Sequence, residues 1–189
     1  MQKLIHILNT DSNRPICLLV MFLLSTGCRL NEALSAQWKN ISLQKRVLTV
    51  PHEISKSKRP RHIVINDAAL NVLNQIDRKE KDKYVFTNPK TNTHFVSVFK
   101  PWNRLRISAS LPNFRLHDCR HVYCTSALES HCSLHEVSQL VGHADSRMVE
   151  KRYAHISSSA MLKAANTVSQ KLSGFMLAKP DDKKLQEAA

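Results

Sequence analysis

A run of apolar residues near the start of the chain, Ile16 to Ser25, constrains the fold more than any other feature. It is apolar on nearly every side, which predicts a helix buried at the centre of a core. Pro15 suits the first turn of this helix, and Thr26 and Gly27 end it. The apolar stretch is far shorter than the roughly 20 residues that span a bilayer, and no small-residue cleavage site follows it. We therefore expect a cytoplasmic protein without a membrane segment.

Length and composition favour one well-packed domain around that helix. The chain has 189 residues, 42% of them hydrophobic, and its three glycines argue against a turn-rich all-β protein. The cysteines are odd in number and form no CxxC pair, so we expect reduced thiols and neither a zinc site nor another cofactor. They are Cys17, Cys28, Cys119, Cys124 and Cys132.

The charge is strongly unbalanced. Lysine and arginine number 28 against 15 acidic residues, which gives a net charge of +13 and a pI near 9.8. Such an excess suits a polyanionic partner, most commonly a DNA backbone. A basic but merely solvated surface is the alternative.

Only the segment from Ile41 to Ile65 has a β-strand pattern. Val47 to Val50 is apolar and β-branched, Glu53 to Ser57 is mixed, and Arg61 to Ile65 is again β-prone. A basic turn, Lys58-Arg59-Pro60, precedes the last of these. This pattern predicts a three-stranded antiparallel meander. Helices are predicted over 1–8, 67–76, 95–108 and 157–172, and Asp67 is the expected cap of the second. Two more helices are predicted between them. One begins near His117, and the other begins at a capping box formed by Ser133 and Glu136. The fold class is therefore mainly α (α+β) with a small three-stranded sheet.

The stretch from His117 to Tyr153 carries the residues with the most chemistry. His117 and Arg120 stand three apart, so they project from one face of a helix. Gly142, His143 and, ten residues later, Tyr153 follow. Two imidazoles, a guanidinium and a phenol can meet at one phosphate, where the cation holds the oxygens and the phenol attacks. Taken singly, each of these residues is more often structural than catalytic.

The motifs HDCRH, LVGH and RYAH in this stretch resemble box II of the tyrosine recombinases, the phage integrase family. The resemblance extends from about Leu18 to about Leu172. The step from His143 to Tyr153 is one residue longer than the family often has, but GHADSRMVEKRYAH is similar to prophage integrases that share this step. The resemblance implies that Tyr153 is the nucleophile, since Tyr123 falls inside the His117 helix and Tyr84 lies in a distal loop region.

Two further segments carry the resemblance. STGCRLNEALSAQW is similar to box I, where Arg29 matches the first catalytic arginine and Glu32 its acidic partner. A carboxylate three residues on can fix a guanidinium in one rotamer, although a surface ion pair has the same spacing. SKSKRPRHIVI resembles the family's β-hairpin, in which Lys56 matches the catalytic lysine and Lys58 is the alternative. These basic residues could instead contact phosphates without catalysis.

The resemblance implies a metal-free and ATP-free reaction with no cofactor. Tyr153 attacks a DNA phosphodiester, and Lys56 protonates the leaving 5′-oxygen. His117 assists deprotonation of Tyr153, and His143 bonds a phosphate oxygen. The implied catalytic set is Arg29, Lys56, His117, Arg120, His143 and Tyr153, with Glu32 in support. The expected DNA contacts are Lys58, Arg59, Arg61, Lys100, Arg104 and Arg106.

The expected organisation is a catalytic domain over residues 1–176 and a polar tail over 177–189, without the N-terminal core-binding domain usual in the family. A fragment and a compact single-domain member both fit. The expected partners are double-stranded DNA, further copies of the chain in a tetramer on paired DNA sites, and accessory DNA-bending or directionality factors at a bacterial nucleoid. The last helix could pack on its own core or on a neighbouring protomer. A DNA-binding regulator and a type IB topoisomerase-like relaxer are the alternative functions.

Overall fold

The computed structural model describes residues 1–54, 60–78, 83–130, 132, 134–142 and 165–172. Within these residues, no helix is long and apolar enough to cross a membrane. Several positions that the sequence singles out lie outside the described residues: Lys56, Lys58, Arg59, Ser133, His143, Tyr153 and the ranges 157–164 and 177–189.

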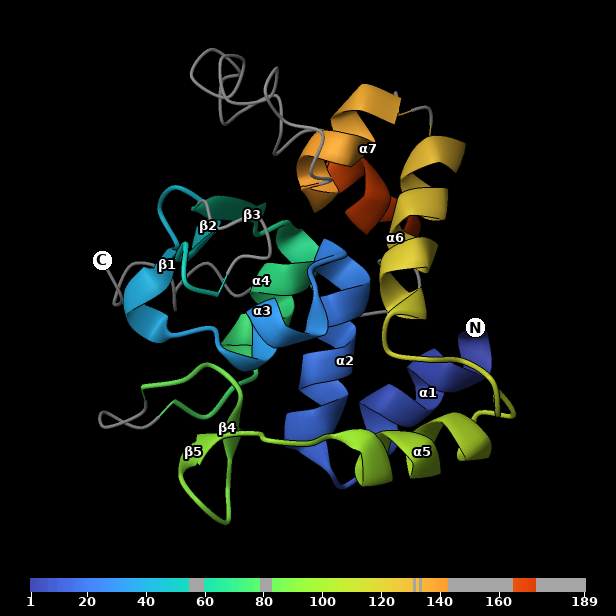
Figure 1. Ribbon diagram of the computed structural model, residues 1–189. Helices are drawn as coiled ribbons and strands as arrows, with labels where there is room; N and C mark the ends of the chain where they lie inside the picture. Colours follow the sequence, from blue (N-terminus) through green and yellow to red (C-terminus); the bar gives the residue numbers. More distant parts are fainter. Residues whose placement is uncertain (55–59, 79–82, 131, 133, 143–164, 173–189) are drawn as a thin grey trace.

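Helix α2 (Arg14–Thr26) forms the centre of the fold, as its sequence predicts. Every residue from Ile16 to Thr26 is buried. The helices packed against it are α1 (Gln2–Thr10), α3 (Leu30–Leu34), α4 (Asp67–Asn74) and α6 (Asp118–Glu129) (Figure 1). A helix that is apolar on all sides needs such neighbours in several directions, because any uncovered face would meet water.

Helix α5 (Phe99–Ser108) packs against α1 at one end of the molecule. Val98 at its N-cap and Trp102 and Leu105 within it are buried. The helix begins four residues later than expected, because residues 95–98 are not helical and Val98 is its N-cap. This end of the fold lies opposite the end that carries α7 (Leu134–Val141) (Figure 1).

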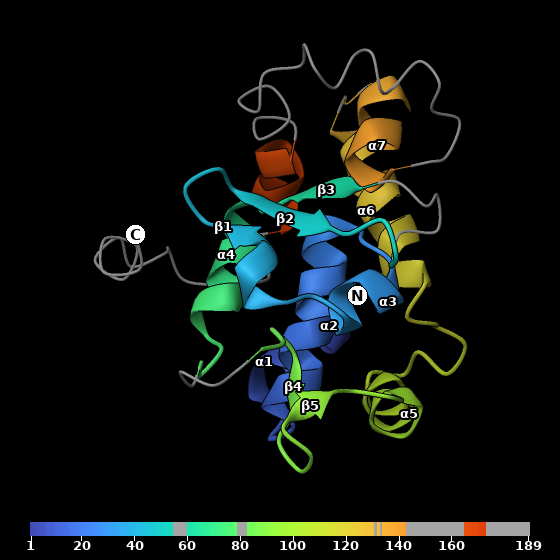
Figure 2. The ribbon, with the colours of Figure 1, turned by 60° about the vertical axis from the view of Figure 1, so that its left-hand side comes forward.

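The predicted meander is present, with different strands. Its strands β1 (Ile41–Ser42), β2 (Val47–Val50) and β3 (Arg61–Val64) pair antiparallel in that order, with Val47 opposite Val64 and Val50 opposite Arg61. The 3₁₀ turn η1 (Trp38–Asn40) precedes β1. Residues 52–54 form a turn, so Glu53 and Ile54 are not in the strand expected over 53–57, whose other residues lie outside the described ones; the third strand of the sheet is β1. Figure 2 shows β2 and β3 side by side, with α7 (Leu134–Val141) above β3.

A second, two-stranded sheet was not expected from the sequence. Strands β4 (Thr87–Asn88) and β5 (Thr93–His94) pair antiparallel. Each strand has only two residues, too few to show the alternation by which a strand is recognised in a sequence. The prediction of a single β region is therefore wrong in this detail.

Helix α4 is capped by Asn66 rather than by the expected Asp67. The Asn66 Oδ1 accepts a hydrogen bond from the Ala69 amide at 2.9 Å. Its buried Nδ2 donates to the Ser25 carbonyl at 2.7 Å and to the Ala165 carbonyl at 3.2 Å. One side chain thus joins the end of α2, the start of α4 and the helical residues 165–172.

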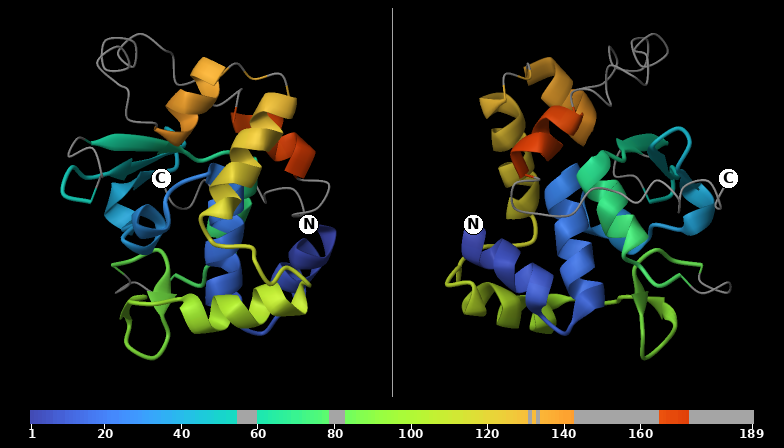
Figure 3. Two further views of the ribbon diagram at one scale, coloured as in Figure 1. Left: turned by 45° about the vertical axis from the view of Figure 1, so that its right-hand side comes forward. Right: turned by 180° about the vertical axis from the view of Figure 1, so that it is seen from behind.

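Residues 165–172 pack on the same chain. Ala165 and Val168 are buried in a cluster with Tyr123 of α6 and Leu140 of α7. The Ala68 amide donates to Ser169 Oγ at 3.1 Å. Figure 3 shows α6, α7 and residues 165–172 gathered at one end of the molecule. Residues 165–172 therefore pack on the chain's own core, which was one of the two alternatives.

Candidate active site

The turn between α2 and α3 places Arg29 at the edge of the core. Gly27 ends α2 with φ 63°, in the left-handed region that glycine adopts most readily. A Cβ on Gly27 would lie 2.5 Å from Cδ1 of Tyr123, so the ring packs directly on the glycine. Both the conformation and the close packing therefore require glycine here. Arg29 follows as the N-cap of α3.

The Glu32 carboxylate lies beneath this turn, with its side chain 2% exposed. It accepts hydrogen bonds from the Arg29 backbone amide at 2.8 Å and from Arg29 Nη1 at 2.9 Å. Arg61 Nη1 reaches both Glu32 oxygens, at 2.9 and 2.8 Å. A buried carboxylate needs such partners, because an unpaired charge in the interior is very costly. The expected pairing of Arg29 with Glu32 is present, and a second cation joins it.

Arg61 is that second cation, and its position corrects an expectation. Its side chain is only 9% exposed, and Nη2 donates to the Leu140 carbonyl at 3.2 Å. We expected Arg61 to contact DNA phosphates, but strand β3 turns it inward together with Ile63, while His62 faces outward. Because its guanidinium is held by protein groups inside the fold, Arg61 is not a surface cation.

The guanidiniums of Arg29 and Arg120 each donate a further hydrogen bond to a backbone carbonyl near this site. Arg29 Nη2 donates to the Gly142 carbonyl at 3.0 Å, and the Arg29 side chain remains 26% exposed. Arg120, on α6, is buried and donates from Nη1 to the Gly27 carbonyl at 2.8 Å. Burial, followed by the nearby charges of Arg61 and Arg29, lowers the pKa of Arg120 to about 10. It therefore stays charged at neutral pH.

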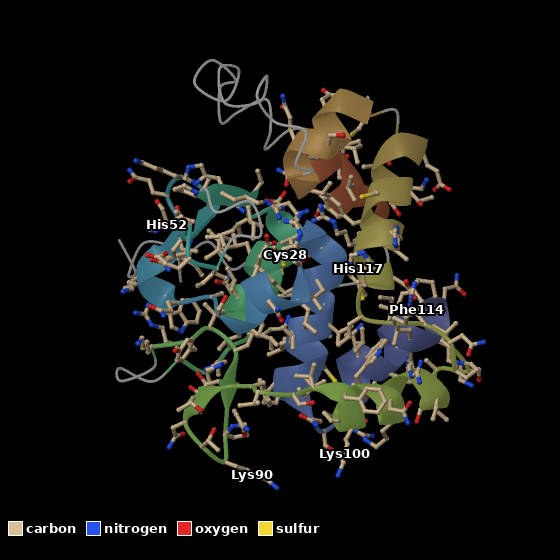
Figure 4. The ribbon with its side chains drawn as sticks, viewed as in Figure 1. Cys28, His52, Lys90, Lys100, Phe114 and His117 are labelled. Atoms are coloured by element: carbon tan, nitrogen blue, oxygen red, sulfur yellow. The ribbon has the colours of Figure 1, made fainter. Side chains whose placement is uncertain are left out.

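His117 lies at the start of α6, where its carbonyl accepts a hydrogen bond from the Arg120 amide. Its ring meets that of His121 edge-on, with centroids 5.1 Å apart. Burial lowers the pKa of His117 below its usual 6.5, and the neighbouring His121 and Arg120 lower it further. A neutral imidazole at physiological pH can accept a proton. Figure 4 labels His117 at the start of α6, and the residue is exposed.

Two groups near the site are unsuited to be nucleophiles. Tyr123 is 2% exposed, and burial raises the pKa of its phenol. Burial likewise raises the pKa of the Cys28 thiol to about 12. All five cysteines are free in the structure. In the described part of the chain, no group of three or more His, Cys, Asp or Glu residues is placed to hold a metal ion.

The three cations predicted on α5 lie apart from this cluster. Figure 4 shows Lys100 at the lower edge of the molecule, away from His117. Arg104 forms two hydrogen bonds of 2.7 Å with Asp11, and Arg106 bonds Asn103 and the Phe114 carbonyl. The charge of Arg104 is thus already matched. Lys100 is exposed and stays a predicted DNA contact.

Sequence reasoning missed the inward place of Arg61 and the role of Gly142. Gly142 has φ 63°, and a Cβ there would overlap the Arg61 guanidinium. The signal for Arg61 was its position two residues from the apolar Ile63, which puts both on one strand face. Lys56, Lys58, Arg59, His143 and Tyr153 lie outside the described residues, so their places in the site stay predictions.

Comparison with known proteins shows the family to which the chain belongs. The model of the phage integrase family matches residues 1–160. The chain is similar to the integrase of Salmonella phage P22, with 27% identity over 169 residues, which cover 84% of this chain and 43% of that protein. It is also similar to the TnP I resolvase of Bacillus thuringiensis, with 26% identity over 155 residues, or 76% of this chain and 51% of that protein. The chain spans about half the length of these relatives.

Two solved structures share the fold. XerA recombinase superposes with a TM-score of 0.62 at 17% identity, covering 91% of this chain and 60% of that one. XerH site-specific recombinase, in a pre-cleavage complex with its difH substrate, gives a TM-score of 0.60 at 18% identity, covering 98% of this chain and 50% of that one. The chain therefore belongs to the phage integrase family, the tyrosine recombinases, and has the fold of their catalytic domain.

Proposed function

We propose that this chain cleaves and rejoins DNA as a site-specific recombinase, through a covalent phosphotyrosine, in the integration or excision of a prophage or other mobile element. The observation that carries the proposal is a cluster of three arginines with one carboxylate: Arg29 and Arg61 bind Glu32, and Arg120 is close enough to interact electrostatically with all three. Three positive charges against one negative charge leave a net positive site. The partial exposure of Arg29 opens that site toward a phosphate.

The reaction would balance as follows. The Tyr153 oxygen forms a bond to phosphorus while the bond from phosphorus to the 5′-oxygen breaks. The phenol proton passes to a base, for which neutral His117 is suited by its lowered pKa. The leaving 5′-oxygen takes a proton from Lys56. Rejoining reverses these transfers when a second 5′-hydroxyl attacks, so no ATP is consumed.

The transition state gathers negative charge on the non-bridging oxygens. Arg29 and Arg120 are the groups that would stabilise it, since guanidiniums bind phosphate oxygens in bidentate geometry. Removing one such donor commonly lowers a rate by about 10²–10³-fold. His143 would bond another phosphate oxygen, and Glu32 would hold Arg29 in its rotamer.

The partners follow from the same chemistry. Strand exchange needs two duplexes and the further copies of the chain that act on them, so we propose a tetramer on paired sites. Accessory DNA-bending or directionality factors would set the outcome. The solved complex of the Tn1549 transposon integrase with circular intermediate DNA supports DNA as the partner.

A nicked duplex that traps the cleaved state tests the proposal. The chain should form a denaturant-resistant adduct with this DNA, and Tyr153→Phe should form none while it binds DNA as before. An adduct in the Phe variant would refute the assignment of the nucleophile. Exchange between two duplexes would separate a recombinase from a topoisomerase-like relaxer. DNA binding without any adduct would indicate a regulator.

A further inference from the structure

The pair formed by Arg61 and Glu32 is the least exposed ion pair of this site, and no step of the reaction proposed above assigns a role to Arg61. Arg61 approaches the carboxylate from β3, while Arg29 approaches it from α3. The two guanidiniums therefore share one negative charge. The Arg61 side chain is 9% exposed and that of Arg29 is 26% exposed, so Arg29 is the one that can also contact a ligand.

We propose that Arg61 is a positioning residue that neutralises Glu32 from the buried side and so leaves the charge of Arg29 available to a phosphate. This inference rests on the proposed function. Without Arg61, Arg29 would be the one cation bonded to Glu32 among the residues that the structure describes. A one-to-one pair is close to neutral, and it attracts an anion far less than a guanidinium whose counter-charge is already matched.

The same two arginines also hold the end of α7. Arg61 Nη2 donates to the Leu140 carbonyl, and Arg29 Nη2 donates to the Gly142 carbonyl. Carbonyls at a helix C-terminus lack partners within the helix and carry partial negative charge, so cations stabilise them. Arg61 packs on Gly142 so closely that a Cβ there would overlap its guanidinium. Arg61 thereby fixes the backbone that leads into position 143.

A charge-balance cycle in the full chain tests this role. Arg61→Met keeps the length of the side chain and removes its charge. It should lower the single-turnover rate of adduct formation on the order of 10- to 100-fold, the size of effect expected from losing a charge-assisted hydrogen bond. Affinity for the nicked duplex should fall less than the rate does, because phosphates outside the site also contribute to binding.

Adding Glu32→Gln to Arg61→Met should then restore part of the rate, by roughly tenfold, because the unmatched carboxylate is gone. A merely structural Arg61 predicts the opposite, since two lost contacts would make the double variant slower than Arg61→Met. Glu32→Gln alone completes the cycle. Arg46→Met is the matched control, because Arg46 also pairs with an acid, Asp67 at 3.1 Å, but it lies just before β2 and its partner is at the start of α4. It should leave the rate within about twofold.

A second readout needs no cleavage and separates this inference from the proposed function. Inorganic phosphate should raise the melting temperature of the wild type, raise that of Arg61→Met much less, and again raise that of the double variant. If the wild type forms no adduct but this pattern holds, the proposed function fails and the charge balance stands. If the wild type forms an adduct and the double variant is slower than Arg61→Met, the inference is overturned and the function stands. Should Arg61→Met not fold, Arg61→Lys keeps the charge, and a rate more than about 100-fold below wild type would overturn the inference.

Discussion

Gly27→Ala perturbs both the core and the candidate site, and its cost in stability follows from two structural features. Alanine in the left-handed conformation of Gly27 costs about 1–2 kcal/mol. The new methyl would also lie 2.5 Å from Tyr123 Cδ1 and 2.9 Å from Cγ. These atoms are at the base of a buried ring, so they cannot swing away, and such overpacking costs about 1–3 kcal/mol. We expect the free energy of unfolding to fall by about 3 kcal/mol.

Urea unfolding followed by circular dichroism measures this loss. Combining Gly27→Ala with Tyr123→Leu tests the cause, because the smaller side chain makes room for the methyl. The double variant should be more stable than the sum of the single losses predicts, by about 1–2 kcal/mol. A loss below about 1 kcal/mol for Gly27→Ala, or strict additivity in the double variant, would refute the reasoning. Adduct formation should fall as well, since the Gly27 carbonyl accepts the hydrogen bond of Arg120.

Three further predictions concern the reaction and its DNA. Because the pKa of His117 is lowered, its neutral, proton-accepting form persists below pH 6.5. The cleavage rate should therefore be constant at neutral pH and fall only in more acidic buffer. His117→Ala should remove this acidic decline from the pH profile. Cleavage should continue in EDTA, because Arg29 and Arg120 supply the positive charge, and loss of activity restored by magnesium would contradict the mechanism. Affinity for DNA should fall on the order of a thousandfold from about 50 to 200 mM salt, with less than about tenfold preference for a cognate site, because phosphate contacts carry little sequence information. A titration of cognate and random duplexes at both salt concentrations measures this.

The parts of the fold that the sequence predicts well are those whose partners lie close along the chain. Helix α2 is recognised from its own apolar run, and the pair of Arg29 and Glu32 from a spacing of three residues. The contacts that complete the site span far greater separations. Arg61 binds Glu32 across 29 residues, and Arg29 binds the Gly142 carbonyl across 113. No local periodicity encodes such contacts, so a cation that the sequence assigns to the surface lies in the core.

The strands show the same limit on a smaller scale. Val47 to Val50 is rich in β-branched residues and is found as β2. Strand β1 has two residues and is defined by its pairing with β2, as Ile41 lies opposite Leu48. The capping of α4 by Asn66 rather than Asp67 also depends on distant partners, because the Ser25 and Ala165 carbonyls bind the Asn66 amide.

The bonds at Gly142 and Ala165 set a limit on where Tyr153 can act. Arg29 holds the chain at the Gly142 carbonyl, and Asn66 holds it again at the Ala165 carbonyl. Tyr153 stands eleven residues after the first anchor and twelve before the second. At no more than about 3.6 Å per residue, it can reach at most about 40 Å from either anchor, whatever path the chain takes. Delivery of the nucleophile to a more distant phosphate would require one of these two anchors to be released.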